Sequence, residues 1–303
     1  MLHELKNGVY EATYAPYEIE DRDTLLLISG EDIFVHSVEP LVFPTYGELK
    51  NALSFPEEGS FPMFLYLFTI EGKRYFTAMD AAYQEPLPGC YRTQHHQLRK
   101  KEPQAESFAG LLGEQLIGWY DRNRFCGRCG HPTIHDGKDR MMRCPKCHNM
   151  IFPQICPSVI VGVFHEGKIL VTYYNPNHMM VNNGSTYSPA VNGTLVAGYI
   201  ETGETAEQAV RREVFEETGL RVKNIRYYMS APWPLSSSLL FGYLCEVDGD
   251  ASVRVDPDEL SDAVFLAPSE LRDRSKEMSL TSRIMEDFRT GKIDGYGAAD
   301  ALS

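Results

Sequence analysis

The sequence lacks any apolar stretch near 18 residues, so it offers no transmembrane helix and predicts no membrane partner. Its start, MLHELKNGVYEATY, lacks the basic and then apolar pattern of a signal peptide, so we expect a cytoplasmic protein. Positive charge is also scarce, because 29 Lys and Arg stand against 42 Asp and Glu, for a net charge of −13. This balance argues against loose, charge-driven binding of nucleic acid, which needs a positive footprint.

Cysteine is present in an odd number, seven, and without a secretory signal this argues against a disulfide framework. Four of the seven form two CxxC pairs, Cys126 with Cys129 and Cys144 with Cys147, separated by fourteen residues. Two such pairs can place four thiolates tetrahedrally around Zn²⁺, one ion per chain. A four-cysteine site has no open coordination position, so we expect a structural zinc ribbon that acts as a spacer between domains.

At 303 residues the chain is long enough for more than one domain. Residues 1–120 predict a β-rich domain with two hairpins, Leu25–Ser29 with Ile33–Val38 and Phe64–Ile70 with Arg74–Ala78. Apolar residues at helical spacing predict a linking helix over Ala105–Tyr120. Residues 121–152 would form the ribbon, and residues 153–303 a third domain.

This third domain alternates apolar runs with turn residues, which predicts a mixed α+β fold. The predicted strands are Ser158–Phe164, Lys168–Tyr173, Leu195–Ala197, Val222–Met229, Leu239–Val247 and Ala263–Leu266. A polar loop is expected over Asn175–Pro189, a stiff Pro-Trp-Pro loop over Ala231–Ser238, and a helix over Ser279–Phe288. Trp233 in the stiff loop is either a stacking platform for a base or a buried cap on the core.

The stretch from Gly198 to Leu220 carries the chemistry. Glu213, Glu216 and Glu217 have the i, i+3 and i+4 spacing that puts three carboxylates on one face of a helix. Their mutual repulsion favours a hard divalent cation such as Mg²⁺ among them, and the alternative is an ordinary solvated acidic helix. Arg212 is placed to bind a carboxylate in bidentate fashion, and Gly219 to end the helix.

These residues resemble the Nudix box, G-x5-E-x7-R-E-U-x-E-E-x-G-U, with U apolar. All nine fixed positions are filled, by Gly198, Glu204, Arg212, Glu213, Val214, Glu216, Glu217, Gly219 and Leu220. The resemblance implies a Nudix hydrolase domain, an α/β/α sandwich with a mixed sheet. Arg212, Glu213, Glu216 and Glu217 would then be catalytic residues.

The order of β-rich domain, four-cysteine ribbon, Nudix box and Pro-Trp-Pro segment resembles the Nudix NAD(H) diphosphatases. That resemblance implies homodimers that hydrolyse NADH or NAD⁺ to nicotinamide mononucleotide and AMP with Mg²⁺ or Mn²⁺. The implied metal ligands are Glu213, Glu216, Glu217, Glu259 and the carbonyl of Ala197. The implied substrate contacts are Phe152, Tyr199, Ala231, Pro232, Trp233, Pro234, Leu235, Ser236, Ser237, Ser238 and Thr281, and Arg99 is a further candidate for a phosphate.

One segment departs from that family, whose loop reads S-Q-P-W-P-F-P-x-S. Ala231, Leu235 and Ser236 stand where the family has Gln, Phe and Pro. The departures leave ADP-ribose and diadenosine polyphosphates as alternative substrates. The resemblance adds the NAD cap of RNA as another, since some members of that family remove such caps, and the ribbon and Arg99 could guide the capped end. A nucleotide sensor without activity is a further alternative, which the complete box disfavours. Glu217 and Glu259 are both candidates for the base.

Overall fold

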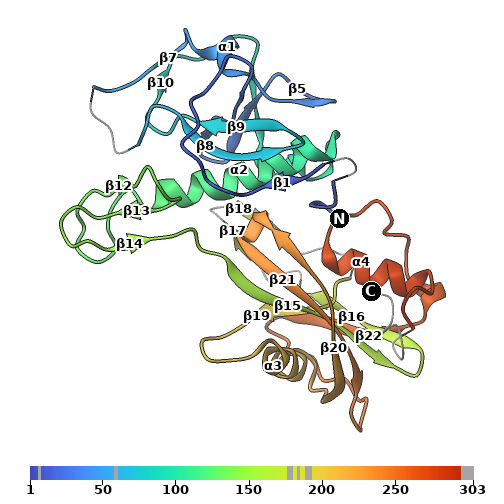
Figure 1. The fold of residues 1–303 in the computed structure, drawn as a ribbon. Helices are drawn as coiled ribbons and strands as arrows, with labels where there is room; N and C mark the ends of the chain where they lie inside the picture. Colours follow the sequence, from blue (N-terminus) through green and yellow to red (C-terminus); the bar gives the residue numbers. More distant parts are fainter. Residues whose placement is uncertain (6–7, 58–60, 176–179, 183–184, 188–192, 295–303) are drawn as a thin grey trace. The chain divides into compact units, whose positions relative to one another are not determined.

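The computed structural model of the chain describes residues 1–5, 8–57, 61–175, 180–182, 185–187 and 193–294. The chain forms two compact units, Leu2–Gln154 and Met1 with Ile155–Ser303 (Figure 1). The residues of the predicted ribbon belong to the first unit, and their division from residues 1–120 as a separate domain stays a prediction. None of the helices among the described residues is long and apolar enough to cross a membrane.

The first unit contains short strands packed around one long helix. Before the ribbon its strands are β1 (Tyr10–Glu11), β2 (Thr24–Leu25), β3 (Ile28–Ser29), β4 (Asp32–Val35), β5 (Ser37–Val38), β6 (Leu41–Val42), β7 (Leu53–Ser54), β8 (Leu65–Ile70), β9 (Lys73–Thr77), β10 (Ala82–Tyr83) and β11 (Tyr91–Gln94). The helices are α1 (Tyr46–Leu49), a 3₁₀ turn (His95–Lys100) and α2 (Gln104–Arg122). The pairs β3–β4 and β8–β9 are antiparallel, so both predicted hairpins and the linking helix are confirmed.

The ribbon folds as a three-stranded sheet in the order β12-β13-β14, with β12 at Ile134–His135, β13 at Met142–Arg143 and β14 at Met150–Ile151. Register places Ile134, Arg143 and Met150 in one row across this sheet, and all three side chains are exposed. Met142, on the opposite face, is fully buried. The ribbon therefore has one packed face and one face open to solvent.

The second unit is built on a six-stranded mixed sheet. The strands of this unit are β15 (Cys156–His165), β16 (Lys168–Tyr174), β17 (Met180–Asn182), β18 (Ser185–Tyr187), β19 (Val196–Tyr199), β20 (Val222–Trp233), β21 (Ser238–Val247) and β22 (Leu260–Leu266). Of these, β17 and β18 pair with each other outside the six-stranded sheet. Its helices are α3 (Ala206–Thr218), α4 (Leu280–Arg289) and two 3₁₀ turns (Pro234–Ser236 and Pro268–Glu270). The sheet order is β20-β21-β15-β16-β22, with β19 paired to β15, and only β15–β21 is a parallel pair.

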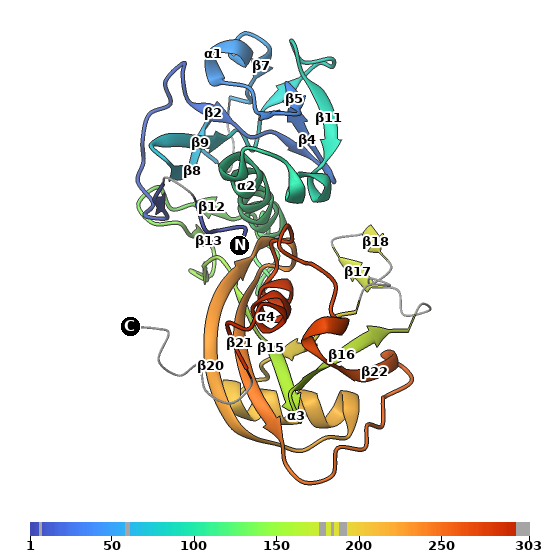
Figure 2. The ribbon, with the colours of Figure 1, turned by 90° about the vertical axis from the view of Figure 1, so that its right-hand side faces the viewer.

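One helix covers each face of this sheet (Figures 1 and 2). Val159, Val161 and Val163 point to the α3 side, where Val210 and Val214 of the helix complete a buried cluster. Ile160 and Phe164 point to the other side, where they meet Ile284 and Phe288 of α4. This alternation is what a strand buried on both faces requires. The predicted α/β/α sandwich with a mixed sheet is confirmed.

Local signals fix both ends of α3. Thr205 is the N-cap, and its Oγ1 accepts a hydrogen bond from the Gln208 N–H at 3.2 Å, while the Thr205 N–H donates to Oε1 of Gln208 at 2.8 Å. Gly219 ends the helix with φ of 71°, a left-handed conformation that glycine adopts without strain. The two ends of α3 are thereby fixed, and so are the positions of the box glutamates along the helix.

Two predictions for this unit are wrong in part. β20 continues from Val222 to Trp233, so Ala231, Pro232 and Trp233 are strand residues instead of loop residues. β20 is the edge strand of the sheet, and an edge strand tolerates proline because its outer N–H groups need no partner. The polar loop over 175–189 contains the hairpin β17–β18, and its other positions from 176 onward lie outside the described residues.

We predict that Thr205→Ala lowers the free energy of unfolding of this unit by about 1 kcal/mol, the usual effect of losing an N-cap oxygen. Thr205→Ser keeps that oxygen and should retain most of the stability. Urea unfolding followed by circular dichroism measures both variants, and equal midpoints for Ala and Ser would contradict the assigned cap.

Candidate active site and zinc ribbon

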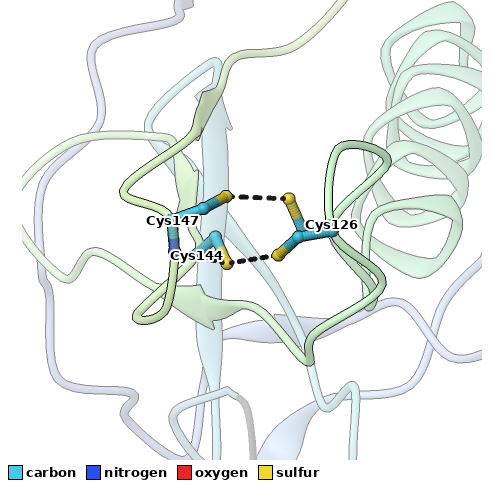
Figure 3. A group of neighbouring side chains, drawn as sticks. Cys126, Cys144 and Cys147 are labelled. Carbon is cyan, nitrogen blue, oxygen red and sulfur yellow. Dashed lines mark hydrogen bonds between the residues drawn. The ribbon is translucent and has the colours of Figure 1, made fainter.

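The four ribbon cysteines come together as predicted. Their sulfur atoms all lie within 4.8 Å of one another, a group of ligand atoms that could hold a metal ion. Sγ of Cys126 is 3.6 Å from Sγ of Cys147, and Sγ of Cys129 is 3.5 Å from Sγ of Cys144 (Figure 3). Each contact joins one CxxC pair to the other, so the two pairs face a common centre.

The surroundings of these sulfurs fit thiolates around a cation. Burial opposes ionisation of Cys126, but backbone N–H groups, among them that of Arg128, lower the pKa of its thiol. The N–H of Cys147 likewise lowers the pKa of Cys144. The backbone N–H of Asn149 lowers the pKa of Cys147, but burial and then the neighbouring sulfurs outweigh it and raise this pKa. Four thiolates this close repel one another, and Zn²⁺ removes the repulsion.

In the second unit, Arg212 is the centre of the box. Its Nε and Nη2 each lie 2.9 Å from an oxygen of Glu204, the predicted bidentate contact. Its Nη1 donates to Glu213 at 2.7 Å and to Glu216 at 3.0 Å. Glu204 hydrogen bonds raise the pKa of the guanidinium, and Arg212 in turn lowers the pKa of Glu204.

Glu217 lies outside this clamp and is only 4% exposed. Its Oε1 faces the backbone N–H of Ala197 at 3.4 Å. Burial, reinforced by the charges of Glu259, Glu213 and Glu216, raises the pKa of Glu217 to about 8. Burial likewise raises the pKa of Glu213. Glu213 thus has the Arg212 guanidinium as its partner, whereas the buried Glu217 faces only a backbone N–H in these contacts.

The backbone beside these acids leaves room for a carboxylate. A Cβ built on Gly198 would come within 1.9 Å of the Glu213 carboxyl carbon, so only glycine lets that group lie against β19. Glu259, in the turn before β22, is close enough that its charge raises the pKa of both Glu213 and Glu217. Carboxylate and carbonyl oxygens are the ligands that hard divalent cations prefer, so these residues fit such an ion.

One geometric prediction is not met. Among the described residues, the four cysteines are the only group of three or more His, Cys, Asp or Glu whose ligand atoms all lie within 4.8 Å. Glu213, Glu216 and Glu217 therefore do not converge on one point in this structure. Arg212 Nη1 turns Glu213 and Glu216 toward the guanidinium, while Glu217 turns inward to the Ala197 N–H.

Several predicted substrate contacts lie on the opposite face of the sheet. Strand register aligns Tyr199, Ser158, Leu240 and Ala231 in one row, and this row faces α4. Tyr199 is 52% exposed, whereas Ala231 is 3% exposed. β19 therefore separates two sets of residues, with the glutamates on the α3 side and the Tyr199 row on the α4 side.

The Pro-Trp-Pro segment closes the β20–β21 hairpin. Trp233 pairs with Ser238, and Pro234–Ser236 form a 3₁₀ turn between the strands, which Ser237 ends. Trp233 is half-buried against the cluster below α4, so it has features of both the core cap and the platform. Pro234 and Ser238 are buried, while Pro232, Leu235, Ser236 and Ser237 are half-buried.

The remaining candidates divide between the units. Thr281 is half-buried in the first turn of α4. Phe152, 54% exposed, and Arg99, in the 3₁₀ turn before α2, belong to the first unit. Sequence reasoning gave Ala197 only a carbonyl role and missed that its N–H holds Glu217, because spacing carries no signal for such a contact.

Comparison with known proteins matches the zinc ribbon and the domain that carries the glutamates, each to its own family model. A model of the NADH pyrophosphatase zinc ribbon domain matches residues 121–152, and a model of the NUDIX domain matches residues 164–288. A protein named NAD-capped RNA hydrolase NudC from Salmonella paratyphi C (strain RKS4594) is 34% identical over 208 residues, 67% of this chain and 76% of that protein. This chain belongs to the Nudix hydrolases of the NADH pyrophosphatase type.

A second relative by sequence agrees with this assignment. The protein of the same name from Salmonella typhi is 35% identical, again over 67% of this Nudix hydrolase and 76% of the relative. A solved Nudix hydrolase from Nitrosomonas europaea aligns at a TM-score of 0.45 and 21% identity, over 56% of this chain and 92% of that one.

We predict that, with divalent ions removed by chelator, this Nudix hydrolase loses stability as the pH rises from about 4.5 to about 8. The pKa of Glu217 is about 8 in the folded state against the ordinary 4.5. The folded state therefore binds the extra proton in this window, and the free energy of unfolding falls as that proton is lost. Glu217→Gln removes the effect, so urea midpoints measured at pH 5 and pH 8 should differ less in the variant. Equal differences would contradict the raised pKa.

Proposed function

We propose that this protein hydrolyses the pyrophosphate bond of NADH or NAD⁺ to nicotinamide mononucleotide and AMP, as a cytoplasmic homodimer that uses Mg²⁺ or Mn²⁺. The observation that carries the proposal is the buried Glu217 of a complete Nudix box. Burial and the charges of Glu259, Glu213 and Glu216 raise its pKa to about 8. The ribbon match and the names of the relatives supply the substrate class.

A pyrophosphate linkage is anionic and repels a nucleophile, so the site has to neutralise charge. When bound, the divalent cation would supply that positive charge and acidify a water molecule. Glu213, Glu217 and Glu259 would hold it, with Glu216 and the Ala197 carbonyl as further ligands. Gly198 would leave the space in which the Glu213 carboxylate lies.

The protein's own groups then orient and move protons. Arg212 holds Glu204 in a bidentate contact and fixes Glu213 beside β19. A carboxylate oxygen of Glu217, or of Glu259, accepts a proton from the attacking water while the oxygen of that water forms a bond to one phosphorus. The bridging P–O bond breaks in line and its electron pair leaves with the other phosphate. Within the second unit, Tyr199 and Trp233 are the aromatic side chains we assign to the rings of the dinucleotide, and Thr281 is a further proposed contact.

The test is release of AMP from NADH, NAD⁺ and ADP-ribose, with Mg²⁺, with Mn²⁺ and with chelator. We predict that Glu217→Gln lowers turnover by at least ~10²-fold, the order expected for loss of a base at a metal site. Glu270→Gln is the matched control, because Glu270 caps an exposed 3₁₀ turn away from the box. No metal-dependent AMP release from any of the three would refute the proposal.

One observation favours NAD-capped RNA as a second substrate. Residues 121–152 contain seven Lys and Arg and three Asp, in a chain whose net charge is −13. A zinc ion with four thiolates carries two negative charges, which leaves an excess of positive charge on the ribbon. Arg128 and Lys146 are exposed, and Phe125 and Met150 are 63% and 60% exposed. Cations beside exposed aromatic and apolar groups are suited to single-stranded RNA.

We predict that Arg128→Ala with Lys146→Ala lowers the salt dependence of activity on NAD-capped RNA. Two lost phosphate contacts reduce the slope of log K against log salt by about 1.4 for a single strand. Hydrolysis of free NADH and the zinc content should stay unchanged. Lys168→Ala with Lys223→Ala removes two charges from the second unit and is the control. The same slope in both double variants would rule out the ribbon as an RNA-binding surface.

A further inference from the structure

Asn175, the residue after β16, is tied twice to a turn far away in the sequence. Its backbone N–H donates to the carbonyl of Glu259 at 2.9 Å. Its side-chain Nδ2 donates to the carbonyl of Pro257 at 3.0 Å. A single residue thus holds two carbonyls of the turn that precedes β22, on either side of Asp258.

The other side of this turn is tied to α3. The N–H of Asp256 donates to the carbonyl of Glu217 at 3.1 Å, so the turn begins where the box helix ends. The carbonyl of Asp256 then accepts from the N–H of Leu260 at 2.8 Å, and its Oδ1 accepts from the N–H of Asp258 at 2.9 Å. The turn that carries Glu259 is therefore held between Asn175 and the helix of the catalytic glutamates.

A bulge in the sheet lies between Asn175 and this turn on one side and the regular part of the β16–β22 pair on the other. The register of β16 against β22 shifts between Tyr173 and Tyr174. Ser261 Oγ lies 3.1 Å from the Tyr173 carbonyl and 3.2 Å from the Tyr174 carbonyl, which pins the irregular point. The pairing passes over Ser261, so the extra residue belongs to β22 and lies directly beside the Glu259 turn.

Glu259 itself is exposed, so nothing in a packed core fixes its direction. Its charge adds to burial in raising the pKa of Glu213 and of Glu217, so Glu259 lies near both of them. Like charges in such proximity would separate if the backbone beneath them were free to move. The hydrogen bonds from Asn175 and Asp256 are what holds that backbone.

We propose that Asn175 is a positioning residue that clamps the Asp256–Glu259 turn and so sets the affinity of the site for a divalent cation. The proposal rests on the proposed function, since it takes Glu259 as a ligand of that cation. Asn175 acts on the cation only through the turn and touches no reacting atom.

The test is binding of Mn²⁺ to the full-length protein, measured by electron paramagnetic resonance without substrate. Asn175→Ala should weaken Mn²⁺ binding about 2- to 10-fold, the range for loss of one hydrogen bond. Ser252→Ala removes a hydrogen bond of similar exposure from the turn at Asp250 and should leave binding unchanged.

The same substitution in a Glu259→Gln background separates positioning from general loosening. If Asn175 acts through Glu259, Asn175→Ala has no further effect there. An equal loss in both backgrounds would overturn the proposal, as would unchanged Mn²⁺ binding in the single Asn175→Ala variant. Failure of the proposed function is distinct, because the wild type would then release no AMP from any dinucleotide.

Discussion

The site depends on how one guanidinium is shared among acids that repel one another. Arg212 contacts Glu204, Glu213 and Glu216, so its positive charge offsets part of the repulsion among these three carboxylates. Glu217 is buried against the Ala197 N–H, and burial together with the neighbouring acids raises its pKa. A divalent ion would supply the missing charge, which links metal binding to proton release in this protein.

This arrangement is possible because α3 cannot slide or rotate on the sheet. The Thr205 cap and the left-handed Gly219 define the ends of the helix, and Val210 and Val214 fix its buried face. The glutamates then point to β19, where Gly198 has no side chain to exclude them. The fold thus fixes the positions of the glutamates on α3, and the repulsion among their charges is concentrated at the few residues beside β19.

The sequence correctly predicted the helix of the box, its end at Gly219 and the group of four cysteines, because each depends on residue spacing within a short stretch. It failed at β20, where Pro232 and Pro234 indicated a loop, because the edge position of that strand depends on the sheet order. It also failed on the convergence of the glutamates. Helical spacing places side chains on one face, but the long Arg212 side chain decides which way each carboxylate turns.

The hairpin of β20 and β21 changes the meaning of the substituted Pro-Trp-Pro segment. Ala231 is 3% exposed and packs beneath α4, so replacing a family glutamine there alters the core. Leu235 and Ser236, by contrast, lie half-buried in the 3₁₀ turn beside Trp233. A change in dinucleotide preference would therefore arise from these two turn residues, and the loss of a polar group at Ala231 is compatible with retained selectivity for NADH.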